Sequence, residues 1–341
     1  MTIVNRQIVL DRRPREYPVY DDFRLVSSEL PEVQDGQIAT KNLYLSLDAG
    51  FRNWMNESSG DNVLPAQPLD EPVMGLTLSR VIESRHPDYA VGDLLMARFA
   101  WEEFSVYSAD EFIVKLPSDL KFPYSYYMGI LGDTGMSAYF GLTDIGRPKE
   151  GETVLVSAGG GAVGSVAGQI ARIFGARAVG MTSGEEKCRR LVEELGYDAT
   201  VDRRSPDGME AAIAAACPDG VDVYFDNVGG EALQAAIANL APGARIAMCG
   251  SITHYNAEEP APGPSNLFEL VTKEALIQGF LTHHRVDRYP EARQQLEEWI
   301  AQGKLKNVEY MLEGIENAGV AFCDMFAGRN FGKTVVRLSE E

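Results

Sequence analysis

The feature that most constrains the fold is a glycine-rich turn between a strand pattern and a helix pattern. Thr153–Ala158 is continuously apolar, as a buried parallel strand is, and Ala162–Phe174 has helical periodicity. Gly159, Gly161 and Gly164 satisfy GxGxxG at the junction. Glycine lets the backbone approach a pyrophosphate, and the helix N-terminus favours that anion. The context therefore predicts a dinucleotide site and disfavours the alternative, a βα turn that binds no ligand.

After Gly151, strand and helix patterns alternate along the chain. This order predicts a doubly wound parallel sheet with right-handed crossovers. The expected strands after the first are 178–181, 200–201, 221–225, 245–249 and 275–281, and the expected helices are 162–174, 185–195, 209–217, 231–240 and 289–303. The segment 251–265 is rich in Pro, Gly, Asn and Glu and is expected to be a long loop, a class that is often functional.

The chain before Lys121 has a different residue pattern. Short β-type segments are separated by Gly, Pro and Asp, and there is little helical periodicity. It predicts a small β-rich domain, with strands expected at 38–45, 77–84, 93–99 and 112–116. A last strand candidate, 333–338, could rejoin it. At roughly 100–200 residues per domain, 341 residues suggest two domains.

The end of the second expected strand favours NADP over NAD. NAD sites usually place an acid there to bond the ribose 2′-hydroxyl, whereas this strand ends in Gly180–Gly184 without one. Lys187, Arg203 and Arg204 could instead bind a 2′-phosphate through charge-assisted bonds. The alternative is that Lys187 only solvates a helix face, which its acidic neighbours in sequence favour.

Charge and composition disfavour several other functions. The formal net charge is −19, and an acidic surface repels nucleic acid and anionic lipid. No apolar run reaches the 18 residues of a membrane helix, and Met1–Leu10 has no signal-peptide pattern, so a cytoplasmic location is expected by default. The four cysteines form no CxxC pair and are expected to be free and mostly buried.

Metal and hydrolase chemistry also have little support. Catalytic zinc needs thiolate and imidazole ligands, yet no cysteine precedes Cys188 and the first part has only His86. No metal is therefore expected, and an acceptor already activated by conjugation is favoured over a simple ketone. His283 and His284 are adjacent, so in a strand they would point to opposite faces. No GxSxG motif is present.

A family resemblance emerges from several motifs in a fixed order. The chain resembles the zinc-independent medium-chain dehydrogenases/reductases, and within them the prostaglandin reductase, alkenal double-bond reductase and curcumin reductase family. The motifs are Asn5-Arg6-Gln7, Tyr44–Asp48, Arg52–Met55, Val91–Asp93, Gly135–Tyr139, Ala162–Ser165, Gly168–Ala171, Asp226–Gly230, Tyr255-Asn256 and Asn330–Lys333.

This resemblance implies a GroES-like β-rich catalytic domain built from both chain ends, residues 1–125 with 308–341. A Rossmann domain, residues 126–307, is inserted between them, with the cofactor in the cleft. It further implies NADPH as the cofactor, a homodimer, and reduction of the C=C bond of α,β-unsaturated aldehydes and ketones.

The resemblance also implies which residues bind and react. Gly161 and Ala162–Ser165 would meet the pyrophosphate, Lys187 and Arg203 the 2′-phosphate, and Phe280, Leu281, Thr282 and Asn330 the nicotinamide end. The cofactor cleft would be lined by Asn227, Cys249, Gly250, Ser251, Ile252 and Tyr255. Tyr255 matches a family tyrosine near the reacting carbonyl.

The sequence departs from the family pattern at several positions near the substrate and the phosphate. Arg203 replaces a usual tyrosine and keeps a phosphate partner. Ala49 and Gly50 stand where a proline and, in some members, a substrate-facing tyrosine occur, so the pocket is expected to be roomier. His254 replaces a common glutamine, and His283 and His284 replace apolar and acidic residues.

The mechanism expected from these residues centres on Tyr255. Hydride attack at the β-carbon moves negative charge to the carbonyl oxygen, and the Tyr255 hydroxyl could stabilise that enolate. Tyr255 or water could protonate the α-carbon, and His254 could shuttle protons because histidine titrates near neutral pH. The alternatives are a zinc-free quinone reductase on the same fold and an NADPH-binding protein without catalysis. The natural substrate and stereochemistry cannot be read from the sequence.

Overall fold

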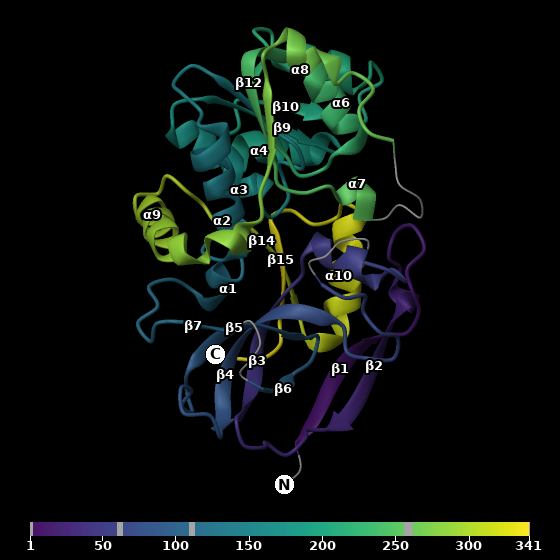
Figure 1. Cartoon of the computed structure of the whole chain (residues 1–341), viewed down its shortest axis with the longest axis vertical. Coiled ribbons are helices and arrows are strands. Elements are labelled where there is room, and N and C mark those ends of the chain that lie inside the picture. The colour runs from purple at the N-terminus through teal and green to yellow at the C-terminus, as the bar shows by residue number, and fades with distance from the viewer. Residues whose placement is uncertain (1–2, 60–63, 109–112, 256–261, 341) are drawn as a thin grey trace. The chain divides into compact units, whose positions relative to one another are not determined.

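We describe the protein from a computed structural model covering residues 3–59, 64–108, 113–255 and 262–340. The chain divides into two compact units. The first comprises 1–128, 310–330 and 334–341, and the second comprises 129–309 and 331–333. Each unit has a large sheet of its own (Figure 1), and the first unit also has a two-stranded antiparallel sheet.

The second unit is built on a six-stranded sheet. The strand order is β10-β9-β8-β11-β12-β13, and every neighbouring pair is parallel. The order reverses between β8 and β11, and ligands bind beyond the carboxyl ends of strands at such a switch point. The doubly wound sheet predicted from the sequence is therefore confirmed. The strands are β8 (Thr153–Val156), β9 (Arg177–Thr182), β10 (Ala199–Asp202), β11 (Val221–Asp226), β12 (Leu240–Met248) and β13 (Leu276–Gly279).

Helices connect these strands and cover the sheet. Helix α3 contacts β8, β9 and α2, whereas α5 contacts β10 and α6. Leu155, Val179, Tyr224 and Ile246 are buried in one core with side chains of α5 and α6. The helices are α2 (Asp133–Phe140), α3 (Gly164–Ile173), α4 (Glu185–Leu195), α5 (Met209–Ala216), α6 (Gly230–Ala238), α7 (Ile252–Tyr255), α8 (Phe268–Thr272) and α9 (Tyr289–Ala301).

The first unit is mostly antiparallel. Strand β3 pairs antiparallel with β4, β6 and the C-terminal strand β15, and β5 pairs with β4 and β7. The chain's last strand thus lies beside one of its first. The elements are β1 (Val4–Leu10), β2 (Phe23–Glu29), β3 (Gln37–Ser46), β4 (Met74–Ser84), β5 (Leu94–Ala100), β6 (Phe104–Ser108), β7 (Ile113–Lys115), α1 (Tyr124–Tyr127), β14 (Glu309–Glu313), α10 (Ala318–Phe326) and β15 (Lys333–Arg337).

The Asn5-Arg6-Gln7 motif has a structural role in this unit. Asn5 Nδ2 and Gln7 Nε2 donate to the buried Glu102 carboxylate at 3.0 and 2.6 Å. Ser105 Oγ donates to its other oxygen at 2.7 Å. Burial raises the pKa of Glu102, and these three donors oppose the rise. The motif therefore satisfies a buried carboxyl group that would otherwise destabilise the domain.

Two expectations need correction. The predicted loop 251–265 begins with the short helix α7, and its residues 256–261, including Asn256 of the family motif, lie outside the described residues. Cys188, Cys217, Cys249 and Cys323 are free thiols, but only Cys217 is fully buried. Within the described ranges, no helix is long and apolar enough to span a bilayer.

Candidate active site

The phosphate-binding turn follows β8 and opens α3. Ala158 has φ +48°, and its carbonyl accepts the Gly161 N–H at 2.8 Å. A Cβ on Gly164 would lie 2.2 Å from the same oxygen, so no side chain fits there. Among the described residues, the Val163 and Gly164 N–H groups donate to no protein acceptor. The turn therefore presents backbone donors at a helix N-terminus, which suits a pyrophosphate.

A cluster of cations lies beyond the end of β9. Lys187 of α4 is half-buried, and desolvation together with the charges of Arg190 and Arg203 lowers its pKa to about 8. Arg190 has a carboxylate partner in Glu194 at 2.5 Å, and Arg203 donates to the Ser183 hydroxyl.

Within the described chain, no carboxylate bonds Lys187. A partly desolvated ammonium that feels the charges of two guanidinium groups is stabilised by a bound dianion. The cluster therefore fits a ribose 2′-phosphate, and the glycine turn and this cluster together fit NADPH.

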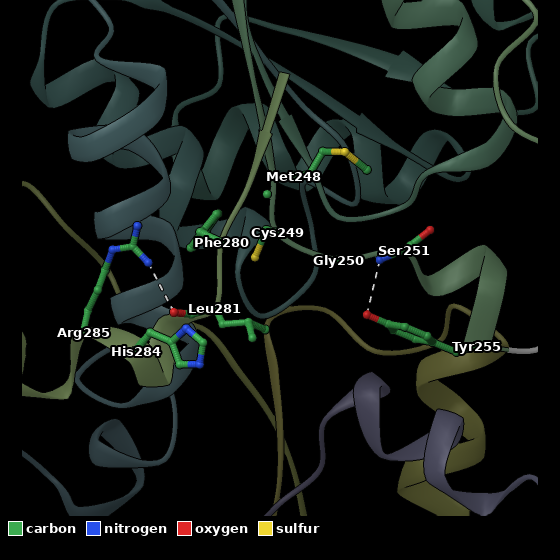
Figure 2. A pocket seen from close by; sticks show the side chains of 10 residues that line it. Met248, Cys249, Gly250, Ser251, Tyr255, Phe280, Leu281, His284 and Arg285 are labelled. Atoms are coloured by element: carbon green, nitrogen blue, oxygen red, sulfur yellow. Dashed lines mark hydrogen bonds between the residues drawn. The ribbon is translucent and has the colours of Figure 1, made fainter. Parts of the chain in front are cut away.

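A pocket of about 580 Å³ opens at the carboxyl ends of β12 and β13. Figure 2 shows Tyr255 on one side of this pocket and His284 and Arg285 on the other. The residues that line it are Met248, Cys249, Gly250, Ser251, Tyr255, Gly279, Phe280, Leu281, His284 and Arg285.

The Tyr255 hydroxyl is held by the backbone of its own short helical segment. Its oxygen accepts the Ser251 N–H at 3.3 Å (Figure 2). A hydroxyl that accepts a hydrogen bond becomes a better donor to a second acceptor. The Ser251 side chain pairs with Nδ1 of the exposed His254, so this histidine contacts a pocket residue. The arrangement can donate a hydrogen bond to a carbonyl oxygen in the pocket.

The lining of the pocket includes one thiol, that of Cys249. Burial raises the pKa of Cys249 to about 12, and the carboxylates of Asp133 and Asp226 act in the same direction. The thiolate is the reactive form of cysteine. A raised pKa therefore makes Cys249 a weak nucleophile near neutral pH.

Two further hydrogen-bond groups fix segments beside the pocket. Thr282 is buried and shares a 2.6 Å hydrogen bond with Ser137 of α2. The Asn227 amide donates from its backbone to Ser157 Oγ at 2.8 Å and from its side chain to Ser157 O at 2.7 Å. Asn227 in turn accepts the Ile252 N–H at 3.3 Å. These bonds connect the ends of β8 and β11 to the segment that carries Tyr255.

The structure brings many, though not all, of the sequence-predicted residues together. Cys249, Gly250, Ser251, Tyr255, Phe280 and Leu281 line the pocket. Ile252 and Thr282 follow lining residues in the sequence, and Asn227 accepts the Ile252 N–H. The glycine turn holds Gly161–Ser165, and the cation cluster holds Lys187 and Arg203. Asn330 belongs to the other unit.

Sequence reasoning missed Met248, Gly279 and Arg285 as pocket residues and Arg190 as a neighbour of Lys187. The spacing of Lys187 and Arg190, three residues apart on a helix, could have indicated the last. His283 and His284 lie in the helical turn Thr282–Arg288 rather than in a strand, and their rings meet edge to face at 4.8 Å.

Across the described part of the chain, no three His, Cys, Asp or Glu residues lie close enough together to hold a metal ion.

The chain matches two family models. An oxidoreductase N-terminal domain covers residues 6–115, and a domain described as zinc-binding dehydrogenase covers residues 162–300. An NADP-dependent oxidoreductase of Bacillus subtilis (strain 168) is 42% identical over 342 residues, covering 100% of this chain and 99% of the relative. The NADPH-dependent curcumin reductase of Escherichia coli (strain K12) is 38% identical, covering 98% and 97%. The NADP-dependent 2-alkenal reductase of Nicotiana tabacum is 37% identical, covering 99% of each.

A solved structure shows that the fold is also shared. CurA from Vibrio vulnificus in complex with NADPH superposes with a TM-score of 0.91 at 36% identity, covering 98% of this chain and 100% of that one. The fold and site thus define a medium-chain oxidoreductase with a GroES-like and a Rossmann domain, as expected. Within that class, the chain belongs to the zinc-independent family of prostaglandin, alkenal and curcumin reductases.

Proposed function

We propose that this NADP-dependent oxidoreductase reduces the C=C bond of α,β-unsaturated aldehydes and ketones. The observation that carries the proposal is the Tyr255 hydroxyl, which lines the pocket and accepts the Ser251 N–H. The family supports it as well, since relatives include a curcumin reductase and a 2-alkenal reductase. The net reaction adds one hydride and one proton across the double bond.

NADPH is the cofactor, and when bound it supplies the hydride. Val163 and Gly164 would hold the pyrophosphate through their N–H groups, with Gly161, Ala162 and Ser165 shaping the turn. Lys187 and Arg203 would hold the 2′-phosphate. The nicotinamide end would lie among Asn227, Cys249–Ile252, Phe280–Thr282 and Asn330.

Tyr255 acts on the acceptor. As hydride reaches the β-carbon, electrons move to the carbonyl oxygen, and the Tyr255 O–H stabilises the resulting enolate by a hydrogen bond. The Ser251 N–H supports this by polarising the phenol. Tyr255 or a water molecule then supplies the α-carbon proton. A tyrosine is suited to this role because its ordinary pKa of about 10 keeps it protonated at pH 7.

The first test is NADPH oxidation with a 2-alkenal, an open-chain enone, a cyclic enone, a quinone and a saturated ketone, with NADH as the comparison donor. We expect turnover of the alkenal or enones with NADPH. Tyr255→Phe should lower kcat by about 10²–10³, the typical cost of one oxyanion donor. Tyr20→Phe, an exposed tyrosine of the other unit, is the matched control.

Two other outcomes of this assay would contradict the proposed reaction. Activity on the quinone alone, insensitive to Tyr255→Phe, would replace the proposal with a quinone reductase. NADPH binding without turnover of any acceptor would favour a non-catalytic role.

We further propose a cytoplasmic homodimer whose substrate domain comprises residues 1–125 and 308–341. Strand β13 supports the dimer because it is the edge of its sheet. The adjoining α8 segment exposes apolar side chains, led by Phe268 at 74% and Val271 at 65%. A second copy would cover both the strand edge and these side chains.

A further inference from the structure

The side of the pocket that faces Tyr255 is basic. His284 and Arg285 follow β13 in the helical turn Thr282–Arg288, and both line the cavity (Figure 2). The enone oxygen is assigned to Tyr255 on the opposite side of the pocket, so the enolate charge does not account for a cation at this position. In a chain of net charge −19, two basic side chains in one cavity call for a functional explanation.

Arg285 retains unused hydrogen-bond donors. Its Nε donates to Asp144 at 2.9 Å and its Nη1 to Leu281 O at 3.2 Å. A guanidinium has five N–H donors, so three remain within the described part of the chain. The His284 ring makes no hydrogen bond there, and its one ring contact is with His283.

The nearby acid does not neutralise this side of the pocket. Asp144 is the carboxylate that holds Arg285, and it also binds Arg288, at 2.8 and 3.2 Å. Among these three side chains, one carboxylate and two guanidinium groups leave a net positive charge, and the further acid that acts on Arg288 is Glu291. Arg285 is partly buried, with its side chain 21% exposed, so solvent screens that charge less than on an open surface.

Asp133 and Asp226, the two acids whose charges act on Cys249, do not line the pocket and are bonded to other groups. Asp133 accepts the Tyr289 hydroxyl at 2.6 Å, and one Asp226 oxygen accepts Ser157, Tyr224 and two backbone N–H groups. No carboxylate among the residues that line the pocket therefore competes with an anion for His284 and Arg285. The phosphates of NADPH have their own proposed partners on α3 and α4, so the anion should come from the substrate.

We propose that the substrate carries a carboxylate in addition to its enone, and that Arg285 and His284 bind this carboxylate while Tyr255 binds the enone oxygen. This proposal rests on the proposed function. Arg285 supplies charge-assisted N–H donors, the strong kind, and His284 supplies a further donor. The separation of the two sides makes the distance between carboxylate and enone a specificity determinant.

The test compares an enone that bears a terminal carboxylate with its methyl ester. The pair shares one reacting group, so the ratio of their kcat/KM values isolates the carboxylate. We expect the acid to be preferred by about tenfold at low salt, and the preference to shrink as ionic strength rises. Arg285→Gln and His284→Gln should each bring the ratio toward one, mainly through KM for the acid. Arg285→Lys should retain part of it.

Lys304→Gln is the matched control, because Lys304 is exposed, lies outside the pocket and carries the same charge. It should leave the ratio unchanged. Equal use of acid and ester by the wild type would overturn the proposal while leaving enone reduction intact. The proposal would also be overturned if Arg285→Gln changed only the KM for NADPH, because this side of the pocket would then bind the cofactor.

Failure of the proposed function gives a different pattern, since neither compound would then be reduced. Calorimetric titration of the NADP⁺-loaded protein with the saturated acid and its ester decides the binding proposal in that case. Tighter binding of the acid, lost in Arg285→Gln, would support it, and equal binding would refute it.

Discussion

Lys187 is a half-buried cation, and we expect its charge state to control how well the protein binds a 2′-phosphate. Desolvation, Arg190 and Arg203 lower its pKa to about 8 in the free protein. Phosphate prefers the protonated form, so binding draws a proton onto Lys187 when the pH is above that value. NADPH affinity should therefore fall as pH rises through 8, with the Kd increasing toward tenfold per pH unit.

Titration of NADPH binding by fluorescence from pH 6.5 to 9.5 checks this prediction. Lys187→Arg should flatten the alkaline loss, because a guanidinium stays protonated throughout this range. NADH lacks the 2′-phosphate and should show no matching trend, which makes it an internal control. An identical pH profile for NADPH with Lys187→Arg would show that another group titrates.

Single residues differ in how far their roles could be predicted. The roles of Gly164 and Lys187 are predicted from local sequence patterns. Gly164 belongs to the glycine-rich turn, and Lys187 follows a strand end that lacks an acid. Arg285 has no such pattern. It reaches the pocket because β13 and β12 end side by side and because Asp144, distant in sequence, holds its guanidinium. Those relations exist only after folding.

At the scale of elements, strong periodicity made prediction accurate. The helix expected at 185–195 has the same bounds as α4, since its apolar and charged residues alternate with a helical period. Strands β1, β2 and β6 were missed because antiparallel strands with exposed faces lack a continuous apolar run. Helix α7 was missed because four residues are too few for a period. Strand β12 begins earlier than expected, at Leu240, where it pairs with Val221.

Helix α3 is positioned by a glycine that allows a close contact with Tyr197. A Cβ on Gly168 would lie 2.0 Å from the Tyr197 ring and 2.2 Å from its hydroxyl. That hydroxyl donates to Gly164 O at 2.7 Å, at the start of the helix. Gly→Ala in a helix ordinarily stabilises by about 0.5–1 kcal/mol. Here overpacking should dominate, and Gly168→Ala should destabilise by about 1–3 kcal/mol.

Denaturant unfolding measures this change, and NADPH titration tests its consequence at the phosphate turn. Because Tyr197 supports Gly164, Gly168→Ala should also weaken NADPH binding. Gly263→Ala is the control, since Gly263 has open space around it, and it should change stability by less than roughly 0.5 kcal/mol. A stabilised Gly168→Ala variant would mean that Tyr197 can move aside.

At the scale of the whole molecule, the net charge of −19 coexists with two local positive sites. One comprises Lys187, Arg190 and Arg203, and the other is formed by Arg285 and Arg288 around Asp144. A strongly acidic chain repels anions at long range, so each site must attract its ligand through short, desolvated contacts. We therefore expect binding specificity to depend on a few local, mostly half-buried cations rather than on the overall field of the protein.

The same acidic surface opposes self-association, so a dimer would need an apolar interface of its own. Leu267, Phe268 and Val271 of the α8 segment and Leu276 of β13 supply one, with exposed fractions between 43% and 74%. An unpaired edge strand beside such a patch can pair with its copy across a two-fold axis and extend the sheet.

Light scattering after gel filtration should give the mass of two chains, and the double variant Phe268→Glu with Val271→Glu should give the mass of one chain. Val91→Glu, an equally exposed valine of the other unit, should leave the dimer intact. A wild-type monomer would refute the dimer itself, whereas a double variant that stays dimeric would move the interface away from β13 and α8.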